Sequence, residues 1–327
     1  MKKWYVVILI SVALICGSGL LISWHWQIGV TDHEYASLIK NGTKSFALEV
    51  PRKMTFCGEE VPLDVYWVKE ALDRELITNT YWQSATLLAL KRANRYFPQI
   101  EPYLLMNKVP DDMKYLALIE SNLLPVVSPA GASGHWQFIK ETGLHYGMEI
   151  NDEVDERYNI EKSTIAACNY LKEAHTKFSS WTLAAAAYNA GPDNISKTLS
   201  LQGANNFYEA AFNPETSRYL FRILAMKEIF NNPRKYGFIY RAKDLYPNIP
   251  VKELKIDTPI TNLSAFAKNQ GLNYKILKEF NPWLRKNTLS NKTHKTYTIS
   301  LPEKEDIYYS KLLQNKELFG VREIDTI

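Results

Sequence analysis

The stretch KYLALIESNLLPVVSPAGASGHWQF, residues 114–138, decides the fold class of this chain and contains its most unusual side chain. Apolar residues lie three and four positions before Glu120 and again three and four positions after it. Residues at these spacings share one face of an α-helix. The sequence therefore predicts a helix over residues 111–124 with a carboxyl group on its apolar face.

A carboxylate on an apolar face is costly to bury in its ionised form, so the pKa of Glu120 should rise unless a cation pairs with it. A carboxyl group that keeps its proton near neutral pH is what general-acid cleavage of a glycosidic bond requires. The competing interpretation is a structural ion pair with Arg157 or Arg218. The helix pattern alone leaves both interpretations open.

The region around this helix is predicted to be mainly α-helical. Apolar residues recur at three- and four-residue steps in four further runs, over residues 64–97, 161–178, 181–189 and 215–230. We expect the first run to stop at Pro98, because proline breaks helices. Alternation with a period of two, which is typical of strands, does not interrupt these runs.

A smaller unit that contains strands is predicted after residue 250. Residues 251–256 and 297–301 have strand-like patterns, and residues 262–270 and 274–280 have short helical patterns. This order predicts a small β-α-α-β module. The last two dozen positions are rich in charge, as expected of a peripheral helix or a tail.

The N-terminal segment determines the compartment. Residues 4–24 carry no charge, are long enough to cross a bilayer as a helix, and follow two lysines. Aromatic residues at both ends favour a retained signal anchor. The small residues 17–19 would suit the alternative, cleavage of a signal peptide. Lipidation of Cys16 is a third alternative, disfavoured by the bulky Ile15 before it. The remaining chain is expected on the periplasmic side of a bacterial membrane.

Composition excludes several other classes of protein. The 327 residues include 39 Lys+Arg and 35 Asp+Glu, and this net charge of +4 is too small to indicate nucleic-acid binding. Beyond the N-terminal segment the cysteines are Cys57 and Cys168, and either a disulfide or two buried thiols fits. The chain lacks HExxH, P-loop and GxSxG patterns, and we expect no cofactor and no metal.

A series of motifs makes a family resemblance specific. After Glu120-Ser121 come SPAGASG at 128–134, WQF at 136–138, VDER at 154–157 and AYNAG at 187–191. Together they resemble the catalytic domain of the family 1 lytic transglycosylases, which is related to goose-type lysozyme. The WQF and VDER variants are most similar to the membrane-bound murein transglycosylase D branch. The resemblance covers about residues 50–235 and implies a lysozyme-like helical domain of the α+β superfamily.

The resemblance also implies roles for individual residues. Glu120 would be the sole catalytic acid and base, and Ser121 would orient it or the sugar. Glu215 would be a second carboxylate in the cleft, and Tyr219 would be a partner of Glu120. His135 stands where the family usually has an apolar residue, which affects a side-chain contact but not the chemistry. Three further residues would line the cleft against N-acetylated sugars: Gln137, Tyr188 and Asn189.

The small C-terminal module resembles a LysM domain. The resemblance rests on FNPWL at 280–284 and YTISLP at 297–302, after a degenerate entry in which IDTP at 256–259 replaces the usual Gly-Asp-Thr. LysM modules bind polymers of N-acetylglucosamine. A module of this kind agrees with an enzyme that acts on the cell wall.

These assignments divide the chain into six segments. We expect a signal anchor or signal peptide, a lead-in segment, a catalytic domain, a linker, a LysM-like module and a C-terminal tail, over residues 1–26, 27–62, 63–235, 236–254, 255–302 and 303–327 respectively.

The resemblance implies a lytic transglycosylase of peptidoglycan that forms a 1,6-anhydromuramic product during cell-wall turnover. Ordinary glycosidases use two carboxylates, whereas residues 121–140 contain no Asp or Glu. A single local acid is consistent with such a lyase. The alternatives are a lysozyme-like hydrolase that uses the same Glu120, and a non-catalytic peptidoglycan-binding protein. The expected partners are peptidoglycan glycan strands and the membrane, with no nucleic acid.

Overall fold

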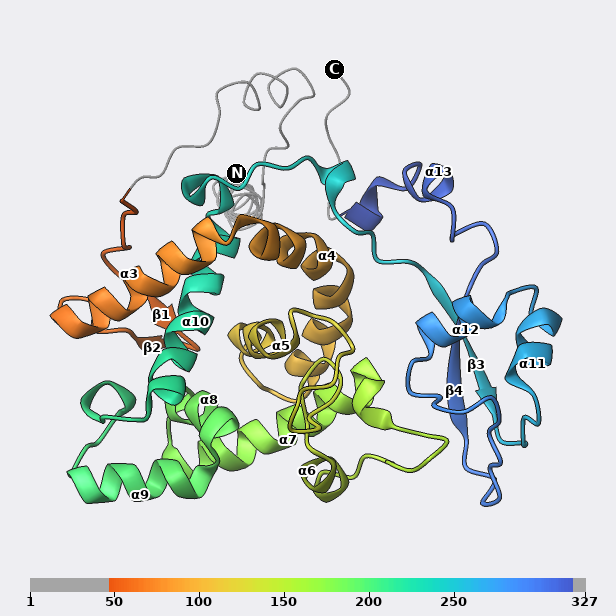
Figure 1. Cartoon of the computed structure of the whole chain (residues 1–327), viewed down its shortest axis with the longest axis horizontal. Coiled ribbons are helices and arrows are strands. Elements are labelled where there is room, and N and C mark those ends of the chain that lie inside the picture. The colour runs from red at the N-terminus through yellow and green to blue at the C-terminus, as the bar shows by residue number, and fades with distance from the viewer. Residues whose placement is uncertain (1–46, 320–327) are drawn as a thin grey trace, which may run out of the picture. The chain divides into compact units, whose positions relative to one another are not determined.

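The computed structural model describes residues 47–319 (Figure 1). These residues all belong to one compact unit. The predicted membrane segment at residues 4–24 lies outside the described residues. Within residues 47–319, no helix combines the length and the apolar character needed to span a bilayer.

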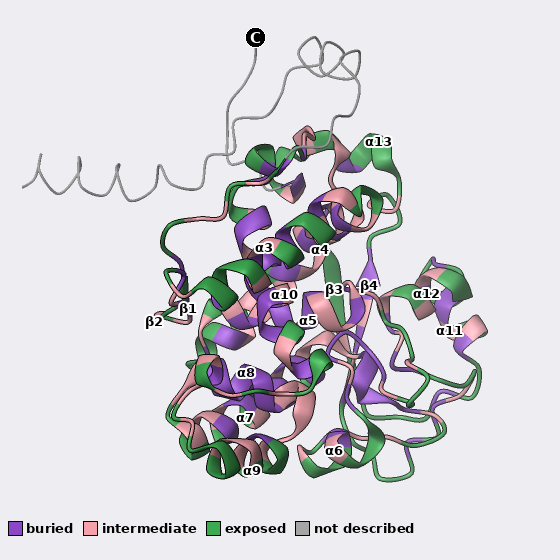
Figure 2. Cartoon of the chain, turned by 60° about the vertical axis from the view of Figure 1, so that its left-hand side comes forward, coloured by how far each residue is buried: buried purple, intermediate pink, exposed green. Residues whose placement is uncertain are grey.

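The main body is helical, which confirms the predicted fold class. Its helices are α3 (Tyr66–Tyr81), α4 (Gln83–Met106), α5 (Lys114–Ser121), α6 (Lys140–His145), α7 (Ile160–Phe178), α8 (Trp181–Ala190), α9 (Pro192–Gln202) and α10 (Pro214–Asn231). Helix α8 contacts α7, α9 and α10. Its four consecutive alanines, residues 184–187, have no exposed surface, so neighbouring helices approach closely (Figure 2).

Helix α4 runs through Pro98 and Pro102, so the predicted stop at Pro98 is wrong. A proline inside a helix removes one backbone hydrogen bond and crowds the carbonyl four residues earlier. Both prolines are exposed, whereas Leu90, Phe97 and Leu104 are buried. Burial of that apolar face stabilises the helix enough to offset the two prolines.

The helix that carries Glu120 is shorter than predicted. A 3₁₀ turn at Asp111–Met113 leads into α5, which ends at Ser121. The next residues, Asn122 and Leu123, have φ angles of 53° and 56° in the left-handed region. Asparagine tolerates this conformation and commonly ends helices. Glu120 therefore lies in the last turn of α5.

The end of the predicted lead-in, residues 27–62, forms a small hairpin. Strands β1 (Thr55–Phe56) and β2 (Glu59–Glu60) are antiparallel. Gly58 in the connecting turn has a φ of 83°, as a two-residue hairpin turn requires. Phe56 has no exposed surface and belongs to the helical core, so this hairpin is part of the packed body.

The C-terminal module has the predicted β-α-α-β order. Its elements are β3 (Val251–Ile256), α11 (Leu263–Asn269), α12 (Tyr274–Phe280) and β4 (Tyr297–Pro302). The two strands pair antiparallel, from Val251 opposite Pro302 to Ile256 opposite Tyr297. The short helix α13 (Tyr309–Leu312) and a 3₁₀ turn at Lys316–Phe319 follow, in the region predicted to be a peripheral helix or tail.

The two described cysteines are free thiols, so the disulfide alternative is wrong. Cys168 is buried and Cys57 is half-buried. Burial raises the pKa of Cys168 to about 12, so its thiol remains protonated at neutral pH.

Candidate active site

Glu120 of α5 lies against Tyr219 of α10. The Tyr219 hydroxyl donates a 2.6 Å hydrogen bond to Oε1 of Glu120. Tyr219 is only 2% exposed, because α10 packs its apolar face against α3, α5 and α8. The hydrogen bond engages one of the two carboxyl oxygens and so fixes the orientation of the Glu120 side chain.

The pKa of Glu120 is raised above its ordinary value. Burial is the main cause, and the charge of Glu215 adds to it, whereas the Tyr219 hydrogen bond and the charge of Arg222 act in the opposite direction. The last turn of a helix also disfavours a negative charge. A larger fraction of Glu120 is therefore protonated at neutral pH than for an exposed glutamate, as a general acid requires.

The two cations suggested as ion-pair partners of Glu120 are engaged elsewhere. Arg157 Nη2 lies 2.7 Å from Asp155 Oδ2. Arg218 Nε lies 2.8 Å from Glu75 Oε1. The interpretation of Glu120 as a core residue paired with one of these arginines is therefore wrong.

Ser121 joins α5 to the small-residue loop, residues 128–138. Its hydroxyl lies 2.8 Å from the carbonyl oxygen of His135 and 3.0 Å from that of Ala117. Ser121 is 6% exposed. Its hydroxyl is thus occupied by backbone carbonyls and connects the residue after Glu120 to the loop.

The side chain of Gln137 binds backbone carbonyls in and just before the same loop. Its backbone has a φ of 51°. Its side-chain Nε2 donates hydrogen bonds to the carbonyl of Gly134 at 2.7 Å and to that of Val126 at 3.0 Å. The preceding Trp136 has no exposed surface, and its Nε1 donates to Thr164 Oγ1 at 2.9 Å. The side chains of WQF therefore fasten the loop to the helical body.

Arg157 contacts this loop through its guanidinium and its backbone. Its Nη1 donates to the carbonyls of Gly131 and Phe138, both at 3.1 Å. Gly134 has a φ of 80°, and a Cβ atom there would lie 1.8 Å from the carbonyl oxygen of Arg157. Only glycine satisfies both the conformation and the close approach.

Tyr188, near the end of α8, lies close to Glu120. Its hydroxyl donates a 2.7 Å hydrogen bond to the carbonyl of Trp136, and its ring contacts those of Trp136 and Phe138 edge-on. Burial, and then the charge of Glu120, hold the pKa of Tyr188 well above its ordinary value. Tyr188 therefore remains a neutral phenol beside the carboxyl group.

Asn189 connects the end of α8 to the start of α10. Its Oδ1 accepts a 3.0 Å hydrogen bond from Thr216 Oγ1, and its Nδ2 lies 3.4 Å from Glu215 Oε1. Glu215 is exposed and lies one helical turn before Tyr219. The structure thus gathers Glu120, Tyr188 and the Asn189–Glu215 pair at one end of α8 and α10.

Comparison with known proteins supports the resemblance. Residues 103–211 match the family model for the transglycosylase SLT domain. This chain carries a transglycosylase SLT domain. Residues 252–305 match the soluble lytic transglycosylase C-terminal LysM-like domain. The SLT match includes Glu120 and the end of α8, while Glu215 and Tyr219 lie a few residues beyond it.

Curated relatives agree with the SLT assignment. The chain is 27% identical over 243 residues to "Membrane-bound lytic murein transglycosylase D" of Escherichia coli (strain K12), and the alignment covers 72% of this chain and 52% of that protein. The protein of the same name from Escherichia coli O6:H1 matches equally. "Putative tributyltin chloride resistance protein" of Alteromonas sp. (strain M-1) is 28% identical over 122 residues, 37% of this chain and 59% of that protein. The chain thus spans about half the length of the murein transglycosylases it matches.

His135 of the SLT domain is a neutral core residue. It is 2% exposed, and its ring lies tilted against that of Tyr96, with the centroids 4.9 Å apart. Burial lowers its pKa to about 4. Neither ring nitrogen has a hydrogen-bond partner among the described residues. The ring therefore occupies the apolar position that the family usually fills with an apolar residue.

One residue near the Glu120 carboxyl group, Arg222, did not emerge from the sequence pattern. Arg222 lowers the pKa of Glu120 and donates a 3.3 Å hydrogen bond to the carbonyl of Ile119. It lies three residues after Tyr219, and residues at this spacing share one face of a helix. That spacing could have indicated that Arg222 also lies near Glu120. Thr216 binds Asn189, and no spacing rule indicates that contact.

Within residues 47–319, no three His, Cys, Asp or Glu side chains are grouped as a metal site requires.

Proposed function

We propose that this chain is a lytic transglycosylase of peptidoglycan, with residues 63–235 as its catalytic domain. It cleaves the β-1,4 bond between N-acetylmuramic acid and N-acetylglucosamine and leaves a 1,6-anhydromuramic end. The observation that carries this proposal is the half-buried Glu120, whose raised pKa and bond to Tyr219 suit a general acid, inside an SLT domain.

In the first step, protonated Glu120 gives its proton to the glycosidic oxygen as the bond to C1 of the muramic sugar breaks. Because the Tyr219 hydroxyl donates to Oε1, the carboxyl proton belongs on Oε2. The 2-acetamido group of the substrate stabilises the positive charge that develops at C1. No second carboxylate of the protein is needed for this step.

In the second step, the Glu120 carboxylate takes the proton of the C6 hydroxyl while that oxygen attacks C1. The new C–O bond closes the anhydro ring, and Glu120 regains its proton for the next cycle. Reaction within one sugar supplies the proximity that a bound water would otherwise have to provide. Tyr219 keeps the carboxyl group in place during both steps.

The remaining site residues bind and position the glycan. Tyr188 lies beside the Glu120 carboxyl group, and Asn189 lies beside Glu215. Their phenol and amide are groups suited to bind N-acetylated sugars. Gln137 and Ser121 act through the loop 128–138, whose conformation their side chains hold.

The products distinguish this proposal from hydrolysis. Glu215 is the carboxylate whose charge raises the pKa of Glu120, so it is the natural base for a water in a hydrolase. We expect muropeptides released from purified sacculi to carry anhydro ends in mass spectrometry. Products with reducing ends and no anhydro form would replace the transglycosylase proposal by hydrolysis.

Replacement of Tyr219 by phenylalanine should move the pH dependence of activity. The Tyr219 hydrogen bond lowers the pKa of Glu120, so its loss raises that pKa. Because the acid must be protonated, the alkaline limb of the pH profile of kcat/KM should shift to higher pH. Poorer positioning should also lower kcat by roughly ten-fold. Turbidity of sacculi at a series of pH values measures both effects.

Tyr236→Phe is the matched control for that variant. Tyr236 is also a buried tyrosine of the same body, and its hydroxyl donates a 3.0 Å hydrogen bond to Glu228, another glutamate. The pH profile of kcat/KM for Tyr236→Phe should coincide with that of the wild type. A shift of the Tyr219→Phe profile to lower pH would contradict the assigned role of the tyrosine.

We further infer that the enzyme acts on the periplasmic side of a bacterial membrane. The uncharged residues 4–24 behind two lysines support an N-terminal anchor or export signal, with Cys16 as the alternative lipid site. Fractionation of cells and determination of the mature N-terminus test this. An intact N-terminus in the soluble cytoplasmic fraction would contradict it.

A further inference from the structure

The C-terminal module is joined to the SLT domain by backbone pairing. Val154 of the SLT domain and Leu284 of the module form an antiparallel β-bridge. On one side of it, the Asp155 amide donates to the carbonyl of Trp283 at 2.9 Å, and on the other the Arg285 amide donates to the carbonyl of Glu153 at 2.7 Å. The two parts therefore share a short strand pair.

Two SLT residues also complete the core of the module. Val154 and Tyr158, which are 1% and 4% exposed, belong to the same apolar cluster as Leu277 and Trp283. The guanidinium of Arg285 lies 4.1 Å from the centre of the Tyr158 ring, a cation–π contact. The module would expose part of its core if it separated from this segment.

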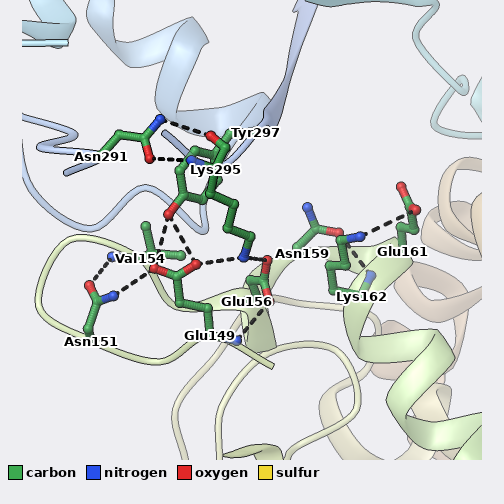
Figure 3. A network of polar contacts seen from close by, with 10 residues as sticks. All are labelled: Glu149, Asn151, Val154, Glu156, Asn159, Glu161, Lys162, Asn291, Lys295 and Tyr297. Carbon is green, nitrogen blue, oxygen red and sulfur yellow. Dashed lines mark hydrogen bonds and ion pairs between the residues drawn. The ribbon is translucent and has the colours of Figure 1, made fainter. Parts of the chain in front are cut away.

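A polar network of SLT and module residues lies near Val154 (Figure 3). Lys295 of the module donates to Glu149 at 2.6 Å and to Glu156 at 3.3 Å, and Tyr297 donates to Glu149 at 3.0 Å. The Glu156 carboxylate in turn accepts a 2.7 Å hydrogen bond from the backbone amide of Glu149. The module thereby holds both ends of the SLT segment 149–156.

Glu153 adds a second anchor at the same junction. Its carboxylate accepts hydrogen bonds from Thr288 Oγ1 at 2.5 Å, and from the amide and hydroxyl of Ser290 at 2.9 Å and 3.0 Å. Because these donors all belong to the module, Glu153 is a contact residue between the two parts rather than part of the active site.

The same segment continues to the loop beside Glu120. Asp155, whose amide binds the module, also holds the Arg157 guanidinium through both carboxylate oxygens, at 2.9 Å and 2.7 Å. Arg157 binds the carbonyls of Gly131 and Phe138 in the loop 128–138. A continuous series of contacts therefore runs from the module through Asp155 and Arg157 to that loop.

We propose that the LysM-like module is a positioning element for the loop 128–138, with Glu153 and Lys295 as its positioning residues. Docking of the module fixes the position of Asp155, and Asp155 fixes the Arg157 guanidinium. Arg157 in turn fixes the loop that contains Gln137. The module thus fixes the loop beside Glu120, in addition to binding any glycan. The kinetic part of this inference rests on the proposed function, whereas the structural part does not.

The test compares full-length Glu153→Ala and Lys295→Met with the wild type. We expect the amides of Ser133 and Gly134, which bind carbonyls within the loop region, to exchange hydrogen about ten-fold faster in both variants. Amides within α10 should be unchanged. On peptidoglycan, kcat/KM should fall by roughly five-fold while sedimentation with sacculi stays the same.

Lys286→Ala is the matched control at the same junction. Lys286 pairs with Asp152 at 2.9 Å, but these side chains are 53% and 88% exposed, so the pair should contribute little.

Unchanged exchange in the loop in both test variants would overturn the proposal. Faster exchange throughout α10 would also overturn it, because that result indicates only general destabilisation. A wild type without lytic activity would refute the proposed function, and exchange would still test the positioning role.

Discussion

Replacement of Glu120 by glutamine is expected to lower the lysis of purified peptidoglycan by about 10²–10⁴-fold, the range that a general acid contributes. Glutamine has nearly the same shape, and its carbonyl oxygen still accepts the hydrogen bond from Tyr219. It has no acidic proton to give to the leaving group. Sedimentation with sacculi should therefore remain while the release of soluble muropeptides is lost.

Glu215→Gln is the matched comparison. Glu215 is exposed and lies 3.4 Å from Asn189, so its replacement should lower activity by less than about ten-fold. Equal lytic activity of wild type and Glu120→Gln would remove Glu120 from the mechanism. An equally severe loss in Glu215→Gln would favour a two-carboxylate hydrolase.

The glutamine variant should also be at least as stable as the wild type at neutral pH. The folded-state pKa of Glu120 lies above its unfolded value, so the favourable contribution of the protonated carboxyl group is lost as the pH rises through the folded-state pKa. Glutamine does not ionise and avoids this loss. Urea unfolding at pH 5 and pH 8 should show the difference between the two proteins widening at the higher pH.

Replacement of Gly134 by alanine is expected to destabilise the protein by roughly 3–5 kcal/mol, as severe steric substitutions do. The added Cβ would lie 1.8 Å from the backbone oxygen of Arg157, which is not the end of a flexible side chain. Relief of this clash requires the loop 128–138 to move away from Arg157. Urea unfolding measures the change in the free energy of unfolding, and lytic activity should fall with it.

Gly131→Ala is a close control for this change. Gly131 has the same φ of 80° in the same loop, but an added Cβ would meet no atom within 4 Å. The cost should be that of the left-handed conformation alone, about 1–2 kcal/mol. Equal destabilisation by the two alanines would show that the contact with Arg157 is unimportant.

The helical fold followed from local spacing. Apolar residues at three- and four-residue steps predicted α7, α8 and α10 to within one residue at each end, and the strands β3 and β4 agree similarly well. These elements bury one continuous face each, so their patterns match their environments. Helices α6 and α9 were not predicted, since each is short or has few buried residues.

Prolines and turns were harder to predict. The exposed Pro98 and Pro102 lie inside α4 because buried residues on the other face hold the helix. The turn at Asn122 shortened the predicted helix, since left-handed residues are not visible in an apolar pattern. Both differences arise from contacts or conformations that helical spacing does not encode.

The sequence by itself determined the mainly helical class, the β-α-α-β module and the unusual position of Glu120, because each depends on residues close together along the chain. The family resemblance already implied Tyr219 as a partner of that carboxyl group, and the tertiary structure alone decided the geometry of this contact and the partners of the nearby arginines. Tyr219 reaches the carboxyl group from 99 residues away, and Arg157 binds Asp155 rather than Glu120. It also joined the module to the SLT domain through Val154. Such contacts depend on how helices and loops pack in space, and the burial and partners that set the pKa of Glu120 exist only after that packing.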